Sequence, residues 1–167
     1  MRSYRTAILF LAVIFTVVTA GCSGTMSPVS KAKATLDVVP AEIFLSPALI
    51  KSPVSFKGAG FQPNEMVSVE MVVPKGLEIK GVGKDEDAVG LAFGTADKDG
   101  NFSAAMQPTA TLNWFFQVGW TPLLRPDFKQ AKPLPPGIYQ INATGMDSGI
   151  AGSSNLKIVP PPKQPQK

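Results

Sequence analysis

The stretch "VSFKGAGFQPNEMVSVEM", residues 54–71, decides the fold class. In its second half every second residue from Val67 to Met71 is apolar, whereas Ser68 and Glu70 occupy the positions between. An apolar side chain at every second position is typical of a β-strand with one buried face. The turn signal "GAGFQPNE" separates this strand from a second alternating run that precedes it.

The same period of two recurs along most of the chain. Further apolar faces consist of Val54 and Phe56; Val89, Leu91 and Phe93; Phe102, Ala104 and Met106; Tyr139, Ile141 and Ala143; and Leu156 and Ile158. The segments "TLDVVP" and "IFLSP" add one or two short edge strands, and signals such as "PKG", "DKDGN" and "LPPG" mark turns. About seven or eight short strands at this spacing predict an all-β, antiparallel β-sandwich.

Residues 107–136 break this pattern. The segment "ATLNWFFQVGW", residues 110–120, carries apolar residues at helical spacing and is compatible with a short helix or a strand. The following "TPLLRPDFKQAKPLPP" predicts a loop interrupted by prolines. Long loops of this kind are often functional, so we treat this aromatic, proline-rich insertion as a candidate site.

The N-terminal 21 residues have the layout of a secretory signal. Arg2 and Arg5 precede an uninterrupted apolar run at residues 6–20, and the small residue Gly21 follows. A run of 15 residues is shorter than the roughly 20 that a membrane-spanning helix needs. A retained anchor is therefore the second interpretation.

Cys22 is the only cysteine in 167 residues, and the chain contains no histidine. The sequence "TAGC", residues 19–22, resembles the lipobox of bacterial lipoproteins. The resemblance implies cleavage between Gly21 and Cys22, acylation of Cys22 with palmitate-like chains, and anchoring to a membrane of the bacterial cell envelope. Ser23 after the cysteine favours the outer membrane if the organism is Gram-negative. The alternative is an ordinary secretory signal followed by a free or buried cysteine.

Composition divides the rest of the chain. Residues 22–34 are small and polar and predict a flexible tether, residues 35–159 hold the sandwich, and residues 160–167 predict a disordered Pro-rich tail. Loss of the signal lowers the formal net charge from +4 to +2, and no cluster of Lys and Arg remains. We therefore expect no nucleic-acid partner.

Three segments, residues 54–71, 94–106 and 134–159, resemble a recurring bacterial immunoglobulin-like module. They match its patterns Gly-x-Gly-Phe-x-Pro-x-Glu, Asp-x-Asp-Gly-x-Phe and Pro-Gly-x-Tyr. The resemblance implies an immunoglobulin-like sandwich and says little about function. The chain departs from the module in its aromatic insertion and in the longer hairpin at residues 76–94.

The glycines of these motifs predict specific turns. Gly58 and Gly60 allow a bulge or a positive φ, so that Phe61 can return to the core. Asp99-Gly100 suits a tight turn in which both residues have positive φ. Pro136-Gly137 re-aims the chain so that Tyr139 can bury its ring and bond its hydroxyl to the backbone, as in a tyrosine corner.

Catalytic and metal-binding patterns are weak. Residues 97–101 start like a calcium loop, but Phe102 and Pro108 stand where Gly and Glu are required, so a hairpin turn is expected. The acids of "KDEDA", residues 84–88, are expected in a solvated turn. Without histidine, and with Cys22 assigned to lipid, we expect no catalytic residues, no metal, no cofactor and no enzyme activity.

The insertion supplies the candidate binding residues Trp114, Phe115, Phe116 and Trp120. Exposed, they could bind a protein, a sugar or a membrane; buried, they would only cap the core. The sequence therefore predicts a membrane-anchored, extracytoplasmic lipoprotein that acts as a structural or protein-binding module of the cell envelope. The alternative is a carbohydrate or cell-wall binding module that uses the stretch from Trp114 to Trp120.

Overall fold

The computed structural model describes residues 33–162, and this part of the chain is predominantly β. A three-stranded sheet has the order β1 (Thr35–Val39), β3 (Ser55–Ala59), β6 (Asn101–Ala105). A five-stranded sheet has the order β2 (Glu42–Phe44), β10 (Ala151–Val159), β9 (Gly137–Gly145), β4 (Met66–Val72), β5 (Ala88–Thr95). A small third sheet pairs β7 (Gly119–Trp120) with β8 (Pro126–Asp127).

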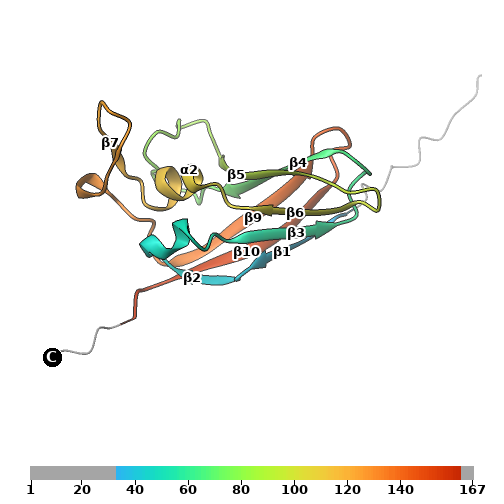
Figure 1. Ribbon diagram of the computed structural model, residues 1–167, viewed down its shortest axis with the longest axis horizontal. Coiled ribbons are helices and arrows are strands. Elements are labelled where there is room, and N and C mark those ends of the chain that lie inside the picture. The colour runs from blue at the N-terminus through green and yellow to red at the C-terminus, as the bar shows by residue number, and fades with distance from the viewer. Residues whose placement is uncertain (1–32, 163–167) are drawn as a thin grey trace, which may run out of the picture. The chain divides into compact units, whose positions relative to one another are not determined.

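All strand pairs are antiparallel except one: β2 runs parallel to β10. The three-stranded and five-stranded sheets contribute their apolar faces to one core, and Figure 1 shows them as two layers. Phe56, Met71, Ile141 and Leu156, from four different strands, are among its completely buried side chains. The alternation seen in the sequence therefore translates into shared burial by the two sheets.

The turn after β3 follows the prediction made for Gly60. Gly60 has φ = 92°, and Phe61 is buried with its ring edge-to-face against Phe102 at a centroid distance of 5.9 Å. The turn before β6 differs in one respect, because Gly100 has positive φ (76°) but Asp99 does not. One glycine is enough to reverse the chain there.

The predicted apolar face of residues 89–93 is partly wrong. Val89 and Leu91 are buried, but Ala92 rather than Phe93 continues the buried face, and Phe93 is half-exposed. The cause is an irregularity in register between β4 and β5, where Val69 pairs with Ala92 but the next residue pairs with Gly90. Leu91 is thus an extra residue in a β-bulge, which shifts the alternation by one position.

The first part of the insertion contains the short helix that the sequence allowed, and the second part, expected as a loop, contains further short elements. The insertion holds α2 (Pro108–Ala110), the π-helix η2 (Thr111–Phe115), β7, β8 and the 3-10 helix η3 (Phe128–Gln130). Another 3-10 helix, η1 (Pro47–Ile50), follows β2. The described residues therefore contain ten strands rather than seven or eight, and β7 and β8 are two-residue strands inside the insertion. No helix within residues 33–162 is long and apolar enough to cross a membrane.

The connections gather at two opposite ends of the sheets. The β3–β4, β5–β6 and β9–β10 turns lie at the end where β1 begins, and the N–H of Ala34 donates to the carbonyl of Ala151 there. Ala34, expected in the tether, is buried at this point. The β4–β5 loop and the insertion lie at the other end (Figure 1). The described chain thus enters the domain far from the candidate site.

Candidate functional site

The structure separates the four predicted aromatic residues into two groups. Phe115 and Phe116 are buried, and Trp114 is partly buried. The indole N–H of Trp114 donates a 3.0 Å hydrogen bond to the carbonyl of Gly90, so that it covers part of the outer edge of β5. Trp120 is instead 44% exposed. Three of the four residues therefore support the core and one faces solvent.

Trp120 belongs to a larger exposed apolar group at the tip of the β7–β8 hairpin. We call Trp120, Leu123, Leu124 and Phe128 the hairpin surface; the last three are 77%, 79% and 48% exposed. Sequence reasoning missed these three. The signal was available, because "PLL" in a proline-rich loop places two leucines in a segment too short to bury them.

Backbone and side-chain contacts hold the hairpin in one shape. Leu124 has φ = 55°, and its N–H donates to the carbonyl of Thr121 at 2.9 Å. The indole N–H of Trp120 donates to the Asn113 side chain at 2.9 Å. Phe128 packs edge-to-face on the buried Phe116, with ring centroids 6.3 Å apart. The hairpin surface is thus fixed to the domain through η2 and the core beneath it.

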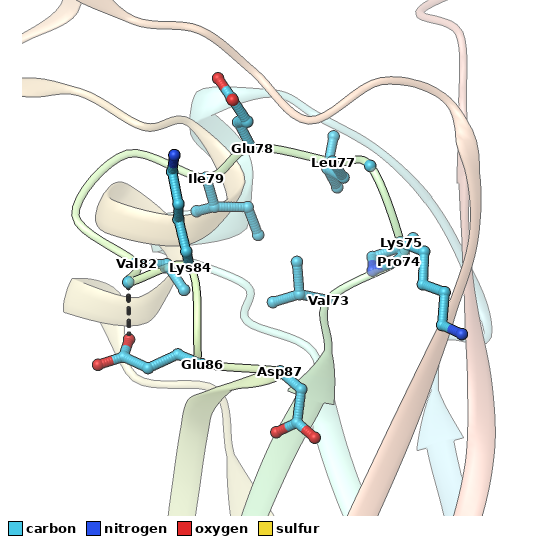
Figure 2. A pocket seen from close by; sticks show the side chains of 12 residues that line it. Val73, Pro74, Lys75, Leu77, Glu78, Ile79, Val82, Lys84, Glu86 and Asp87 are labelled. Carbon is cyan, nitrogen blue, oxygen red and sulfur yellow. Dashed lines mark hydrogen bonds between the residues drawn. The ribbon is translucent and has the colours of Figure 1, made fainter.

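Beside the hairpin, residues 73–87 form a loop whose ends meet. The Val73 N–H donates to the Asp87 carbonyl at 2.8 Å, as in an Ω-loop. The loop surrounds a hollow of about 620 Å³. The aliphatic side chains of Val73, Ile79 and Val82 lie on its lining (Figure 2). The acids of residues 84–88 lie exposed on its rim, and Glu86 accepts a hydrogen bond from the Gly83 N–H.

A polar groove of about 630 Å³ separates the Ω-loop from the base of the hairpin. It is lined by Glu78, Ile79, Lys80, Gln117, Gln130 and Lys132. Gln117 is buried, has φ = 47°, and accepts a 2.8 Å hydrogen bond from the Lys80 N–H on its Oε1. This contact joins two loops that are 37 residues apart in sequence.

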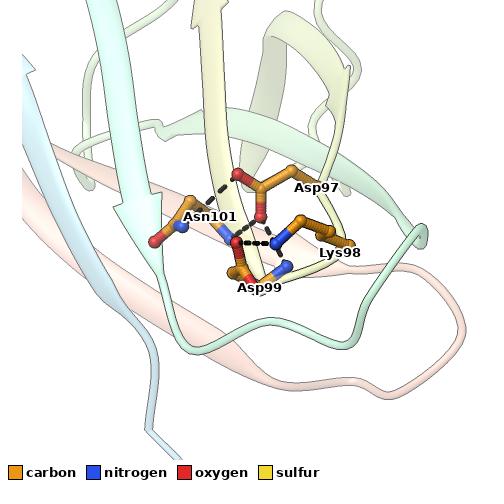
Figure 3. A network of polar contacts seen from close by, with 4 residues as sticks. All are labelled: Asp97, Lys98, Asp99 and Asn101. Carbon is orange, nitrogen blue, oxygen red and sulfur yellow. Dashed lines mark hydrogen bonds and ion pairs between the residues drawn. The ribbon is translucent and has the colours of Figure 1, made fainter.

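The turn at residues 97–101 uses its acids internally (Figure 3). Oδ1 of Asp97 accepts from the N–H groups of Asp99 and Asn101, and Oδ2 accepts from the Asn101 amide. The hydrogen bond from the Asn101 N–H is the main reason why the pKa of Asp97 is lowered, despite an opposing desolvation effect. The carboxylate is occupied by the turn itself.

The acids of residues 84–88 lie too far from Asp97 to share a calcium ion with it. These acids precede β5 and Asp97 follows it, so the length of an eight-residue strand, roughly 25 Å, separates them. Among the described residues, no three side chains of Asp, Glu, His or Cys are grouped so that they could hold a metal ion.

Glu65, the last residue of the Gly-x-Gly-Phe-x-Pro-x-Glu pattern, is a buried carboxylate. Burial by itself raises its pKa, but hydrogen bonds from the N–H groups of Gln62, Ser148 and Asp147 and from the Ser148 hydroxyl lower it below the ordinary value. Glu65 thus links the β3–β4 turn to the β9–β10 turn. Its role is structural, at the end away from the hairpin.

Gly21 and Cys22, the predicted cleavage and lipidation residues, lie outside the described residues. No protein-family model matches the chain, and no curated protein matches its sequence. A proposal about function therefore has to be argued from the hairpin surface, the Ω-loop and the polar groove.

Proposed function

We propose that this chain is a membrane-anchored, extracytoplasmic lipoprotein that binds a protein partner of the cell envelope through its hairpin surface. Two features support the anchor: the lipobox-like residues 19–22 and the polar stretch between them and the first strand. An immunoglobulin-like sandwich is the scaffold. Its support includes the hydroxyl of Tyr139, which donates to the Pro135 carbonyl at 2.7 Å in the manner of a tyrosine corner.

One observation carries the binding proposal: a rigid hairpin exposes Trp120, Leu123, Leu124 and Phe128 together. Solvated apolar side chains of this size are stabilised when a partner covers them, and Trp is frequent among interface residues that dominate affinity. The hairpin surface lies at the end of the domain opposite Ala34. A tether that enters near Ala34 therefore joins the domain at the end opposite the hairpin.

The surroundings of Trp120 favour a protein over a glycan. Sugar sites combine a flat aromatic ring with polar groups that bond hydroxyls. The exposed side chains of the hairpin itself, Leu123, Leu124 and Phe128, are apolar, whereas the polar groove lies at its base, and the Trp120 indole N–H is already bonded to Asn113. We therefore rank the carbohydrate-binding function second. Catalysis is not part of the proposal, since the chain contains no histidine that could act as the base for a nucleophile.

Site-specific photocrosslinking in cells tests the partner. A crosslinker replaces Leu124 in the full-length protein, and a matched control replaces Ile138, which is 68% exposed on β9. We expect a crosslinked protein at position 124 and not at 138. The purified partner should bind the lipoprotein, and Trp120→Ala should weaken that binding at least about tenfold.

Two results would overturn the proposal. The first is equal crosslinking at positions 124 and 138; the second is a Trp120→Ala variant that loses glycan binding but keeps protein binding.

The anchor is tested separately with Cys22→Ser. This variant should lose lipid labelling and membrane retention, and unchanged retention without label would contradict the anchor.

A further inference from the structure

The polar groove has a composition unlike that of the hairpin surface. Glutamine amides and lysines line it, and its volume of about 630 Å³ lies within the range of ligand sites. It adjoins the hairpin, because Gln130 follows Phe128 by two residues and its side chain lies against Gly119 of β7. A Cβ built on Gly119 would lie 2.9 Å from Oε1 of Gln130, so glycine allows this close packing.

Gln117 is the unusual residue of the groove. A side chain longer than that of Asn is seldom found in the left-handed region, and such strain persists where the surrounding structure imposes it. Gln117 is 5% exposed, and its Oε1 accepts from the Lys80 N–H. Within the described residues, every fully buried side-chain polar atom has a hydrogen-bond partner. Nε2 of Gln117 forms no hydrogen bond with a described residue, so this atom is not fully buried. Nε2 is therefore accessible from the groove as a donor.

The charges of the groove are not neutralised in pairs. The ion pairs within residues 33–162 are Lys98–Asp99 and Lys157–Glu42, so Lys80 and Lys132 form none with a described residue. Glu78 is the single acid on the lining, which gives the groove an excess of one positive charge. Two ammonium groups and an amide N–H match the acceptor oxygens of a carboxylate.

We propose that the groove binds an Asp or Glu side chain of the protein partner, next to the apolar contacts of the hairpin surface. This inference rests on the proposed function. The partner segment would carry a carboxylate beside one or more apolar residues. Lys80 and Lys132 supply the charge, Gln117 donates its Nε2–H, and Gln130 forms a fixed wall held by its bond to Asp127.

The test uses two peptides that differ in one carboxylate: acetyl-Leu-Glu-Leu-amide and acetyl-Leu-Gln-Leu-amide. Each is titrated into the full-length, ¹⁵N-labelled lipoprotein in detergent micelles, and the side-chain amide signal of Gln117 is followed by NMR. A disaccharide that contains glucuronate forms a third arm. We expect saturable shifts with the Glu peptide, at an affinity at least about tenfold above that for the Gln peptide.

Matched variants separate charge from folding. Lys80→Gln with Lys132→Gln should reduce binding of the Glu peptide to the level of the Gln peptide. Lys75→Gln with Lys84→Gln makes the same charge change on the Ω-loop, outside the groove, and should leave binding unchanged. Gln117→Gly removes the amide and the backbone strain together, and it should weaken binding several-fold in a domain that still melts cooperatively.

Equal affinity for the two peptides, no shift at Gln117, or tighter binding of the disaccharide would overturn the inference. If the groove fails in this way while crosslinking at position 124 persists, only the carboxylate contact is wrong. Loss of both results overturns the proposed function as well.

Discussion

The carboxylate of Glu65 accepts hydrogen bonds from both the N–H and the hydroxyl of Ser148, at 3.1 and 3.0 Å, across 83 residues of sequence. The same carboxylate accepts from the Gln62 N–H at 2.6 Å. One buried side chain therefore satisfies donors from two turns of the domain. Gly145 makes this possible, because a Cβ at that position would overlap the Glu65 carboxylate.

Replacement of Glu65 should therefore destabilise the domain strongly. Glu65→Ala leaves the N–H groups of Gln62 and Ser148 without their acceptor, and the free energy of unfolding should fall by about 1–3 kcal/mol. Urea denaturation measures the change. Asp37→Ala, on the exposed face of β1, is the control and should shift stability by less than about 0.5 kcal/mol. Equal effects of the two substitutions would contradict this role.

Glu65 should also make stability depend on acid pH. Its pKa lies below the ordinary value of 4.5, so the ionised form stabilises the fold above that pH, and this contribution is lost as the pH falls through the lowered pKa. The difference in unfolding free energy between wild type and Glu65→Gln should shrink as the pH is lowered below 4.5. Asp97, whose pKa is also lowered, is present in both proteins and cancels. A difference independent of pH would refute the prediction.

The ionisation of the Tyr139 phenol should show that its ring is buried. Desolvation raises the pKa of its phenol above 10.0, and its hydroxyl donates to the Pro135 carbonyl. Tyr139→Phe should lower stability by about 1 kcal/mol. A pH titration of the ultraviolet absorbance, taken as the difference between wild type and this variant, should show a phenol that ionises above pH 10.0. Ionisation at or below that pH would show that the ring is not buried.

Trp114 and Trp120 should respond differently to the same substitution. Trp114→Phe removes the donor to the Gly90 carbonyl, and the free energy of unfolding should fall by about 1 kcal/mol. The substitution also uncovers part of the β5 edge, and an open strand edge promotes association between copies of the protein. Trp120→Phe removes the bond to Asn113, but Trp120 is half-exposed and water can replace that bond, so stability should change by less than about 0.5 kcal/mol. Denaturation and light scattering of the two variants give the comparison. Association of the Trp120 variant alone would reverse the assignment.

The sequence predicted the all-β class because period-two alternation depends only on which face of a strand is buried. Tyr139 to Ala143 follow that rule, and so do Val67, Val69 and Met71, although Ser68 between them is buried as well. Phe93 does not, because the bulge in β5 arises from its pairing with β4 and leaves no local signal. Trp114 and Trp120 lie six positions apart, and their roles differ through tertiary contacts, since Trp114 packs on the core and donates to the distant Gly90 carbonyl whereas Trp120 is half-exposed. The groove depends on the contact between Gln117 and Lys80, which no local pattern contains.

The parallel pairing of β2 with β10 has a mechanical consequence. β10 leads toward the end of the domain where the hairpin lies, whereas β1 enters from the other end. Tension between these ends would load the β2–β10 contacts in shear. The bond from the Lys157 N–H to the Ala41 carbonyl and the Lys157–Glu42 ion pair would then resist together rather than one after another. A pull between the start of β1 and the end of β10 would therefore meet this resistance along the full length of the β2–β10 pair.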